Sequence, residues 1–198
     1  MTHQRCASLI AAGSLALLSG CAAGSIANTA LQLVGIRPTP ELPESQQPPR
    51  KVEIRLHASS SLNTDASGQS LALVARIYKL RQSAAFQQMP YESFLNAHAE
   101  HDALGSDLVE VKEVLLVPGQ HVEVQEKVPR EAAFIGVVAL FRAPAEQRWR
   151  LAFAASDAEK SGITVGVHAC ALSIGSGAGA LGADQSTLKQ PLSNLHCL

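Results

Sequence analysis

The sequence predicts a mainly β protein, a two-sheet β-sandwich with a small helical insertion between the second and third strands. Short segments with alternating apolar and polar residues recur between Lys51 and Leu172, and turn-forming residues separate them. After the second segment, the spacing of apolar residues changes to a near-helical one. About seven or eight strands result, which is the number that a two-sheet sandwich needs.

Residues 1–20 have the features of a signal peptide that is removed during export. Arg5 precedes an apolar run from Leu9 to Leu18, which has about half of the roughly 20 residues that a membrane-spanning helix needs. The run ends at Leu18-Ser19-Gly20-Cys21, which fits a lipobox, the motif whose cysteine thiol receives a diacylglycerol. We therefore expect cleavage before Cys21 and lipid on its thiol. The alternative is an ordinary secretory signal that leaves Cys21 unmodified.

Residues 21–50 are expected to form the lipidated N-terminus and a proline-rich tether. Ala22 follows the cysteine in place of an aspartate, which favours the outer membrane under the enterobacterial sorting convention. Prolines are frequent between Pro38 and Pro49, and the segment has too little apolar surface to offset the entropy of ordering it. The β-sandwich domain is then expected over residues 51–172, and a Gly-rich extension over 173–198.

A long turn-rich loop separates the first two predicted strands. Val52 to Ala58 alternates as a half-buried strand does, and Leu71 to Leu80 is apolar enough for the interior of a sandwich. Residues 59–70 between them are rich in Ser, Asn, Asp and Gly. A connection of this length in a compact domain is often functional, although a solvated linker is the simpler interpretation.

The helical insertion is predicted by apolar residues over 83–88 and 91–104, with Pro90 at a first-turn position. His98 and His101 lie in the second segment and place two imidazoles at neighbouring helical positions. A third ligand with matching spacing is missing, so a solvated helix face is a better interpretation than a zinc site.

Two strands of the second half are predicted to form a hairpin. Val109 to Val117 and His121 to Val128 flank the turn dipeptide Pro118-Gly119. A nearly continuous apolar strand follows over 132–141, and in it Gly136 indicates a close approach of another group to the backbone.

The last strands are predicted over 148–153 and 163–172. The first of them contains Trp149, Leu151 and Phe153, which we expect to face the core because alternate residues share a face. Arg148 and Arg150 are then expected on the opposite face, so core packing is preferred to a role for Trp149 as an interface anchor.

Charge and cysteine content limit the possible functions. The formal net charge is −1, which argues against nucleic-acid binding. Of the four cysteines, Cys6 leaves with the signal peptide and Cys21 is assigned to the lipid. Cys170 and Cys197 remain as a possible disulfide in an oxidising compartment, and two free thiols are the alternative.

Catalytic motifs are weak in this sequence. Ser59-Ser60-Ser61 lacks the glycines of a nucleophile elbow, and residues 175–179 lack the lysine of a phosphate-binding loop. We expect no enzyme activity, no metal and no cofactor other than the covalent lipid on Cys21.

Beyond these separate features, the chain resembles the TssJ (SciN) family, the outer-membrane lipoproteins of type VI secretion systems. The resemblance rests on the lipobox, the proline-rich tether and a set of motifs in a fixed order between Cys21 and Leu172. These motifs are Val52-Glu53-Ile54-Arg55-Leu56, the Asn63 loop, residues 73–80, Phe86, Phe94, Leu104-Gly105, Leu116-Val117-Pro118-Gly119, residues 135–142 and Trp149-Arg150.

The resemblance implies a transthyretin-like sandwich anchored in the outer membrane on its periplasmic face. It also implies a partner, the periplasmic C-terminal region of the inner-membrane protein TssM, and TssL through it. In that family the loop between the first two strands contributes to TssM binding. By position, the contact candidates here are Leu62, Asn63, Thr64 and Asp65, and no small-molecule substrate is expected.

Two alternatives remain from other functional classes. One is a periplasmic transthyretin-like lipoprotein that binds a small hydrophobic ligand, which requires a large apolar pocket between the sheets. The other is a periplasmic hydrolase, which requires a convergent Ser/His/Asp or metal cluster.

Overall fold

The structure is a computed structural model that describes residues 42–182 and Cys197. The predicted signal peptide, Cys21 and most of the predicted tether therefore lie outside the described residues. The chain divides into two compact units, Met1–Glu41 and Leu42–Leu198, and the second is the one described below. None of the helices within the described ranges has the length and apolar character needed to cross a membrane.

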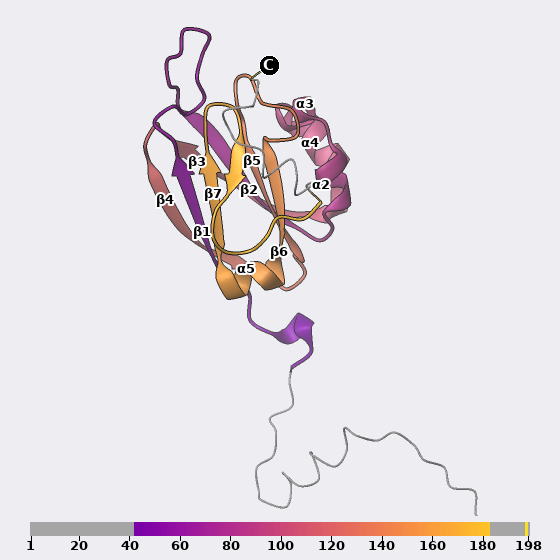
Figure 1. Ribbon diagram of the computed structural model, residues 1–198. Helices are drawn as coiled ribbons and strands as arrows, with labels where there is room; N and C mark the ends of the chain where they lie inside the picture. Colours follow the sequence, from indigo (N-terminus) through magenta and orange to yellow (C-terminus); the bar gives the residue numbers. More distant parts are fainter. Residues whose placement is uncertain (1–41, 183–196, 198) are drawn as a thin grey trace, which may run out of the picture. The chain divides into compact units, whose positions relative to one another are not determined.

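Within the described residues, eight strands form two four-stranded sheets that pack face to face (Figure 1). Sheet A has the order β4-β1-β7-β8 and sheet B the order β3-β2-β5-β6. The strands of sheet A are β4 His121–Val128, β1 Arg50–Ala58, β7 Ile163–Val167 and β8 Leu172–Ile174. Those of sheet B are β3 Leu108–Leu116, β2 Leu73–Leu80, β5 Phe134–Ala139 and β6 Arg150–Ala154. The predicted β-sandwich is confirmed.

The core lies between the two sheets, where alternate residues of each strand meet. Ile54 and Leu56 of β1 face Ile77, Ile135 and Val137 of sheet B, and all five side chains are at most 1% exposed. The period-two pattern that predicted these strands is therefore the pattern of burial.

Three short helices cover the outer face of sheet B, and they lie between β2 and β3 as predicted (Figure 1). They are α2 Ala84–Gln88, α3 Tyr91–Phe94 and α4 Ala97–Leu104, and a 3-10 turn, η2 Gly105–Asp107, leads into β3. The ring of Phe86 lies directly over Gly136 of β5, where a Cβ would be 2.5 Å from the ring. Gly136 thus permits the close approach that the sequence predicted.

A buried carboxylate also holds α4 to the sheet. Glu100 is 7% exposed, and it accepts hydrogen bonds from Arg76 Nη1 at 2.9 Å and from the Tyr78 hydroxyl. Because both donors belong to β2, the helical insertion is fixed to the sheet by charge-assisted bonds as well as by packing.

The predicted hairpin is wrong. The turn exists, since the N–H of Gln120 donates to the carbonyl of Val117 at 3.1 Å, but β3 pairs with β2 and β4 pairs with β1. The Pro118-Gly119 turn therefore connects the two sheets. The inward-facing residues of β3 and β4 contact the same core, β3 from sheet B and β4 from sheet A. The residues of the turn are compatible with either arrangement, so they do not identify the partner of each strand.

A cluster of charges lies between the sheets, where β3 and β4 form neighbouring edges. Lys79 is 4% exposed and Glu126 6% exposed in their side chains, and Lys79 Nζ lies 3.0 Å from Glu126 Oε2. Lys112 and Glu110 complete the cluster, at 2.6 Å from Glu126 and 2.9 Å from Lys79. Charges that point inward from edge strands discourage edge-to-edge pairing with other chains.

The C-terminal part differs from the prediction in two places. The segment 163–172 is two strands, β7 and β8, rather than one. The sequence analysis also missed helix α5 Ala155–Ser161, which connects β6 of sheet B to β7 of sheet A and lets β7 pair parallel with β1. Beyond β8, the Gly-rich segment returns along β6, where Ala180 bridges Phe153.

Candidate interaction surface

Four connections meet at one end of the sandwich, which we call the loop end. They are the β1–β2 loop (59–72), the β3–β4 turn (117–120), the β5–β6 loop (140–149) and the β7–β8 turn (168–171). Backbone hydrogen bonds join them: Gly119 N–H donates to Ser59 O at 3.1 Å, and Ala145 N–H donates to Cys170 O at 2.8 Å. The loop end is therefore a continuous ordered surface rather than a set of separate loops.

Asn63 is the centre of this surface. Its side chain is buried, its Oδ1 accepts the N–H of Arg142 at 2.8 Å and its Nδ2 donates to Ala72 O at 3.1 Å. Its own N–H donates to His168 O at 3.1 Å, and its φ of 46° is in the left-handed region that asparagine tolerates. One side chain and its backbone thus tie three of the four connections together.

This geometry corrects two of the predicted contact residues. Leu62 is fully buried in the core and Asn63 is 6% exposed, so neither side chain reaches the surface. Both hold the base of the loop in place. Thr64 and Asp65 remain half-exposed, and the exposed tip of the loop consists of residues 66–69.

Asp65 organises that tip. Its Oδ1 accepts from the N–H and hydroxyl of Ser67 at 2.8 and 2.7 Å and from the N–H of Gln69 at 2.9 Å. The hydrogen bond from the Ser67 side chain, followed by the one from Gln69, lowers the pKa of Asp65. The carboxylate is thus kept ionised and satisfied within its own loop, which gives a short exposed turn a defined shape.

Exposed apolar residues accompany the polar tip. Leu71, Leu115 and Val117, which we call the apolar rim, are 36%, 62% and 45% exposed. Leu115 lies in the turn-proximal part of β3, and Val117 is the first residue of the β3–β4 turn. The sequence analysis missed this surface. Its signal is the run of four apolar residues from Val114 to Val117, of which a strand can bury only alternate members.

The predicted orientation of the residues around Trp149 is partly wrong. All three apolar side chains belong to the buried core as predicted, but only Leu151 and Phe153 face sheet A, whereas Trp149 packs against Tyr91 and Phe94 of the helical insertion, with ring centroids 5.0 and 5.2 Å away. Arg148 is 1% exposed, and its Nε donates to Leu172 O at 3.3 Å. Trp149 precedes the first residue of β6, so strand alternation does not fix its direction.

A disulfide also contributes to the loop end. The sulfurs of Cys170 and Cys197 are bonded at 2.07 Å, and the Cα atoms are 5.7 Å apart. Cys170 lies in the β7–β8 turn and packs against Ala145 and Ala171. The bond thus attaches the end of the C-terminal extension to the loop end.

A serine–histidine pair occurs nearby but lacks the arrangement of a hydrolase. His168 Nε2 lies 2.8 Å from Ser173 Oγ. A catalytic triad needs a carboxylate to orient the imidazole and to stabilise its cation. Burial, and then the positive charge of Arg148, lower the pKa of His168 instead. The charge that acts on this imidazole is thus positive, whereas a triad needs the negative charge of a carboxylate.

The residues of the other predicted sites are placed as follows. His98 and His101 are both exposed on α4. Two surface hollows have volumes of about 590 and 530 Å³; Pro129 lines the first, and Tyr91 and Trp149 help to line the second. Neither lies between the sheets, where a carrier of an apolar ligand would need its pocket. Inner-face residues fill that space.

The sandwich and its loop end define a β-sandwich protein in which a packed scaffold positions surface loops. Comparison with known proteins gives the family. Residues 50–170, more than half of the chain, match the model of the type VI secretion lipoproteins VasD, EvfM and TssJ. The chain therefore belongs to the TssJ (SciN) family of type VI secretion lipoproteins, as the sequence resemblance predicted. No curated protein sequence matches it.

Solved structures agree with this assignment. The T6SS lipoprotein TssJ1 from Pseudomonas aeruginosa is 30% identical, with a TM-score of 0.58 over 65% of this chain and 97% of that one. A chain of a type VI membrane complex is 26% identical, with a TM-score of 0.58 over 63% and 97% of the two chains. A chain in a structure described as the TssM C-terminal domain from EAEC is also 26% identical, with a TM-score of 0.56 and the same coverage.

Proposed function

We propose that this lipoprotein is anchored by lipid on Cys21 to the periplasmic face of the outer membrane, and that its loop end binds the periplasmic C-terminal region of TssM. Through TssM it is connected to TssL, so that it positions the membrane complex of a type VI secretion system. The observation that carries this proposal is the ordered loop end, because it combines a shaped polar tip with exposed apolar residues on a rigid scaffold.

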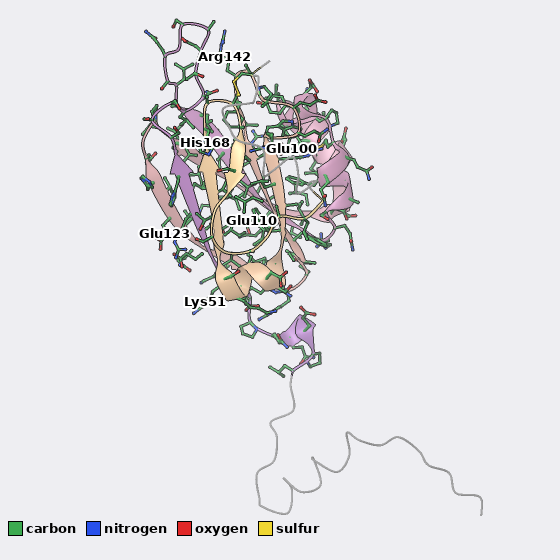
Figure 2. The ribbon with its side chains drawn as sticks, viewed as in Figure 1. Lys51, Glu100, Glu110, Glu123, Arg142 and His168 are labelled. Atoms are coloured by element: carbon green, nitrogen blue, oxygen red, sulfur yellow. A yellow bond between two sulfur atoms is a disulfide. The ribbon has the colours of Figure 1, made fainter. Side chains whose placement is uncertain are left out.

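The direction of β1 supports this arrangement. Residues 42–49 join the domain beside α5, and the chain then runs along β1 to the loop end (Figure 1). In Figure 2, Lys51 and Arg142 lie at these opposite ends. At about 3.3 Å per residue, the nine-residue strand β1 spans roughly 26 Å between these two ends of the sandwich. The segment that carries the proposed lipid anchor thus joins the domain at the end opposite the loop end.

The similar structures support the choice of partner. One of the matching chains belongs to a type VI membrane complex, and another to a structure described by the TssM C-terminal domain. Proteins with this fold therefore occur in such assemblies. The apolar rim adds a physical reason, because exposed apolar residues beside polar groups are typical of protein interfaces.

Binding to a TssM fragment tests the loop end. The double substitution Leu115→Asp/Val117→Asp is expected to weaken binding by about tenfold or more, since charge on an apolar contact costs over 1 kcal/mol. Val111→Asp is the matched control, because Val111 is 42% exposed on the same strand but farther from the loop end. Isothermal titration calorimetry with the periplasmic C-terminal fragment of TssM measures both. Equal losses in the two variants, or no binding by the unmodified protein, would contradict the proposal.

Membrane fractionation tests the anchor. Cys21→Ser is expected to move the protein from the membrane fraction to the soluble periplasm, because acyl chains contribute about 0.8 kcal/mol per buried methylene. Cys6→Ser is the control, since Cys6 lies within the predicted signal peptide. Retention of the Cys21→Ser protein in the outer membrane would refute the lipid anchor.

A further inference from the structure

Two histidines on neighbouring strands of sheet A face each other. His57 of β1 pairs with His121 of β4, and their ring centroids are 4.7 Å apart at an interplanar angle of 66°. The N–H of Ala58 donates to Gln120 O at 2.8 Å. This bond flanks the pair, which identifies it as a non-hydrogen-bonded pair, the type in which opposing side chains are closest.

Both imidazoles lie on the surface with their nitrogens available. His57 and His121 are exposed. Within the described part of the chain, neither imidazole forms a hydrogen bond or an ion pair, and the two rings contact each other. Imidazole nitrogen is a good ligand for divalent transition metals, and exposed rings can rotate to direct one nitrogen each toward a shared ion.

The neighbouring charges do not exclude a cation. Glu123 lies two residues from His121 on the same face of β4, and it pairs with Arg55 of β1, whose Nε is 3.8 Å from Glu123 Oε2. Arg55 also forms an ion pair with Glu53 of its own strand, so these three side chains carry a net negative charge and do not repel a cation beside the histidines.

A third histidine lies in the same part of the sheet but has another role. Gly166 pairs with His57 on the other side of β1, and His168 Nε2 fills the space above Gly166, 2.7 Å from where a Cβ would be. That nitrogen is already engaged with Ser173 Oγ. Two imidazoles therefore remain for a shared ligand.

We propose that His57 and His121 form a two-histidine binding site for a divalent transition-metal ion on the outer face of sheet A. Within the described residues no group of three or more His, Cys, Asp or Glu side chains is placed to hold a metal ion, so water would complete the coordination. A site with two nitrogen ligands and open positions fits Cu²⁺ and Ni²⁺, which accept tetragonal nitrogen and oxygen ligands, and then Zn²⁺. By the general order of affinities, Cu²⁺ binds most tightly.

Titration of the chain that begins at Ala22 with Cu²⁺ and, separately, with Zn²⁺ tests this site, because His3 and the thiol of Cys21, which would themselves bind these ions, are then absent. Calorimetry is expected to give one ion per chain. His57→Gln and His121→Gln are each expected to weaken binding by about tenfold or more, since each removes one arm of a chelate. For Cu²⁺, electron paramagnetic resonance is expected to show coupling to two nitrogens, and to one in either variant.

The control is His98→Gln/His101→Gln, which removes two exposed imidazoles three residues apart on α4. This variant is expected to bind with unchanged affinity. The proposal is overturned if this control removes the binding, or if His57→Gln/His121→Gln binds as tightly as the unmodified chain. Absence of binding by the unmodified chain overturns it as well. All four side chains are exposed, so thermal unfolding is expected to show that each variant folds.

Discussion

Asn63 and Arg142 join two loops that are 79 residues apart in the sequence, because the Asn63 Oδ1 accepts the Arg142 N–H at 2.8 Å. The β1–β2 loop owes its shape to this bond, to the one that Asn63 donates to Ala72, and to the Leu62 side chain beneath it. The base of the β1–β2 loop is therefore held by the folded domain, whereas the side chains at its tip are exposed.

Asn63→Ala is expected to lower the free energy of unfolding by about 2–3 kcal/mol. The change leaves the N–H of Arg142 and the carbonyl of Ala72 without their side-chain partner, and it places alanine at a positive φ. Asn63→Asp keeps the acceptor for Arg142 but loses the donor to Ala72, so an intermediate loss is expected. Urea unfolding measures both, with Thr64→Ala as the control. A loss below about 0.5 kcal/mol for Asn63→Ala would show that the loop does not depend on these bonds.

Gly136→Ala is expected to destabilise the domain by about 1–3 kcal/mol, because the added Cβ would overlap the ring of Phe86. Sheet B and the helical insertion must separate to accommodate it. Gly179→Ala is the control, since a Cβ there has no atom within 4 Å. Thermal unfolding compares the two, and equal melting temperatures would mean that the insertion moves without cost.

The sequence predicted the strands well because alternation reports burial on one face, as in β1 and β4. It did not predict the pairing of β3 with β2. A strand shows the same alternation in either sheet of a sandwich, because both sheets face one core, so the pattern does not tell which strand lies beside it. The contact residues show the same limit. Leu62 and Asn63 are in the predicted loop, but a turn-rich composition does not indicate that an asparagine is buried by hydrogen bonds from distant segments.

Stability is expected to fall as the pH is lowered from 7 toward 5, and His168 contributes to this loss. Burial, and then Arg148, lower the pKa of His168 below its usual value of 6.5. Between the two values the unfolded chain binds a proton that the folded chain does not, so acidification favours unfolding. His168→Gln is expected to show a smaller decrease over this range, and His98→Gln an unchanged one. Denaturant unfolding at pH 7 and 5 measures the difference. Identical pH dependence in all three proteins would exclude this contribution.

Unfolded, non-reduced protein is expected to show no reactive thiol from Cys170 or Cys197, because the two sulfurs are bonded. The bond closes a long loop, which is worth about 3–4 kcal/mol in the loop-entropy description. Cys170→Ala/Cys197→Ala is expected to lose stability of this order. Thiol titration under denaturing conditions checks the bond, and two reactive thiols in addition to any at Cys21 would show that it does not form.

The charge cluster between the sheets gives the last prediction. Glu126→Leu is expected to cost about 3 kcal/mol or more, because it leaves the buried ammonium of Lys79 with only Glu110 as a partner at the surface. Burial acts to raise the pKa of Glu126, but hydrogen bonds from Lys112 and Lys79 outweigh it and lower the pKa, so the carboxylate is ionised at neutral pH.

Lys79→Met/Glu126→Leu is then expected to recover most of this loss, since two apolar side chains need no counter-ion in the core. Urea unfolding of the two single variants and the double variant measures the coupling. If the inward charges protect the β3 and β4 edges, the double variant is expected to be stable but more prone to associate at high concentration. Light scattering detects that association. If the double variant stays monomeric, the charge cluster does not protect the strand edges.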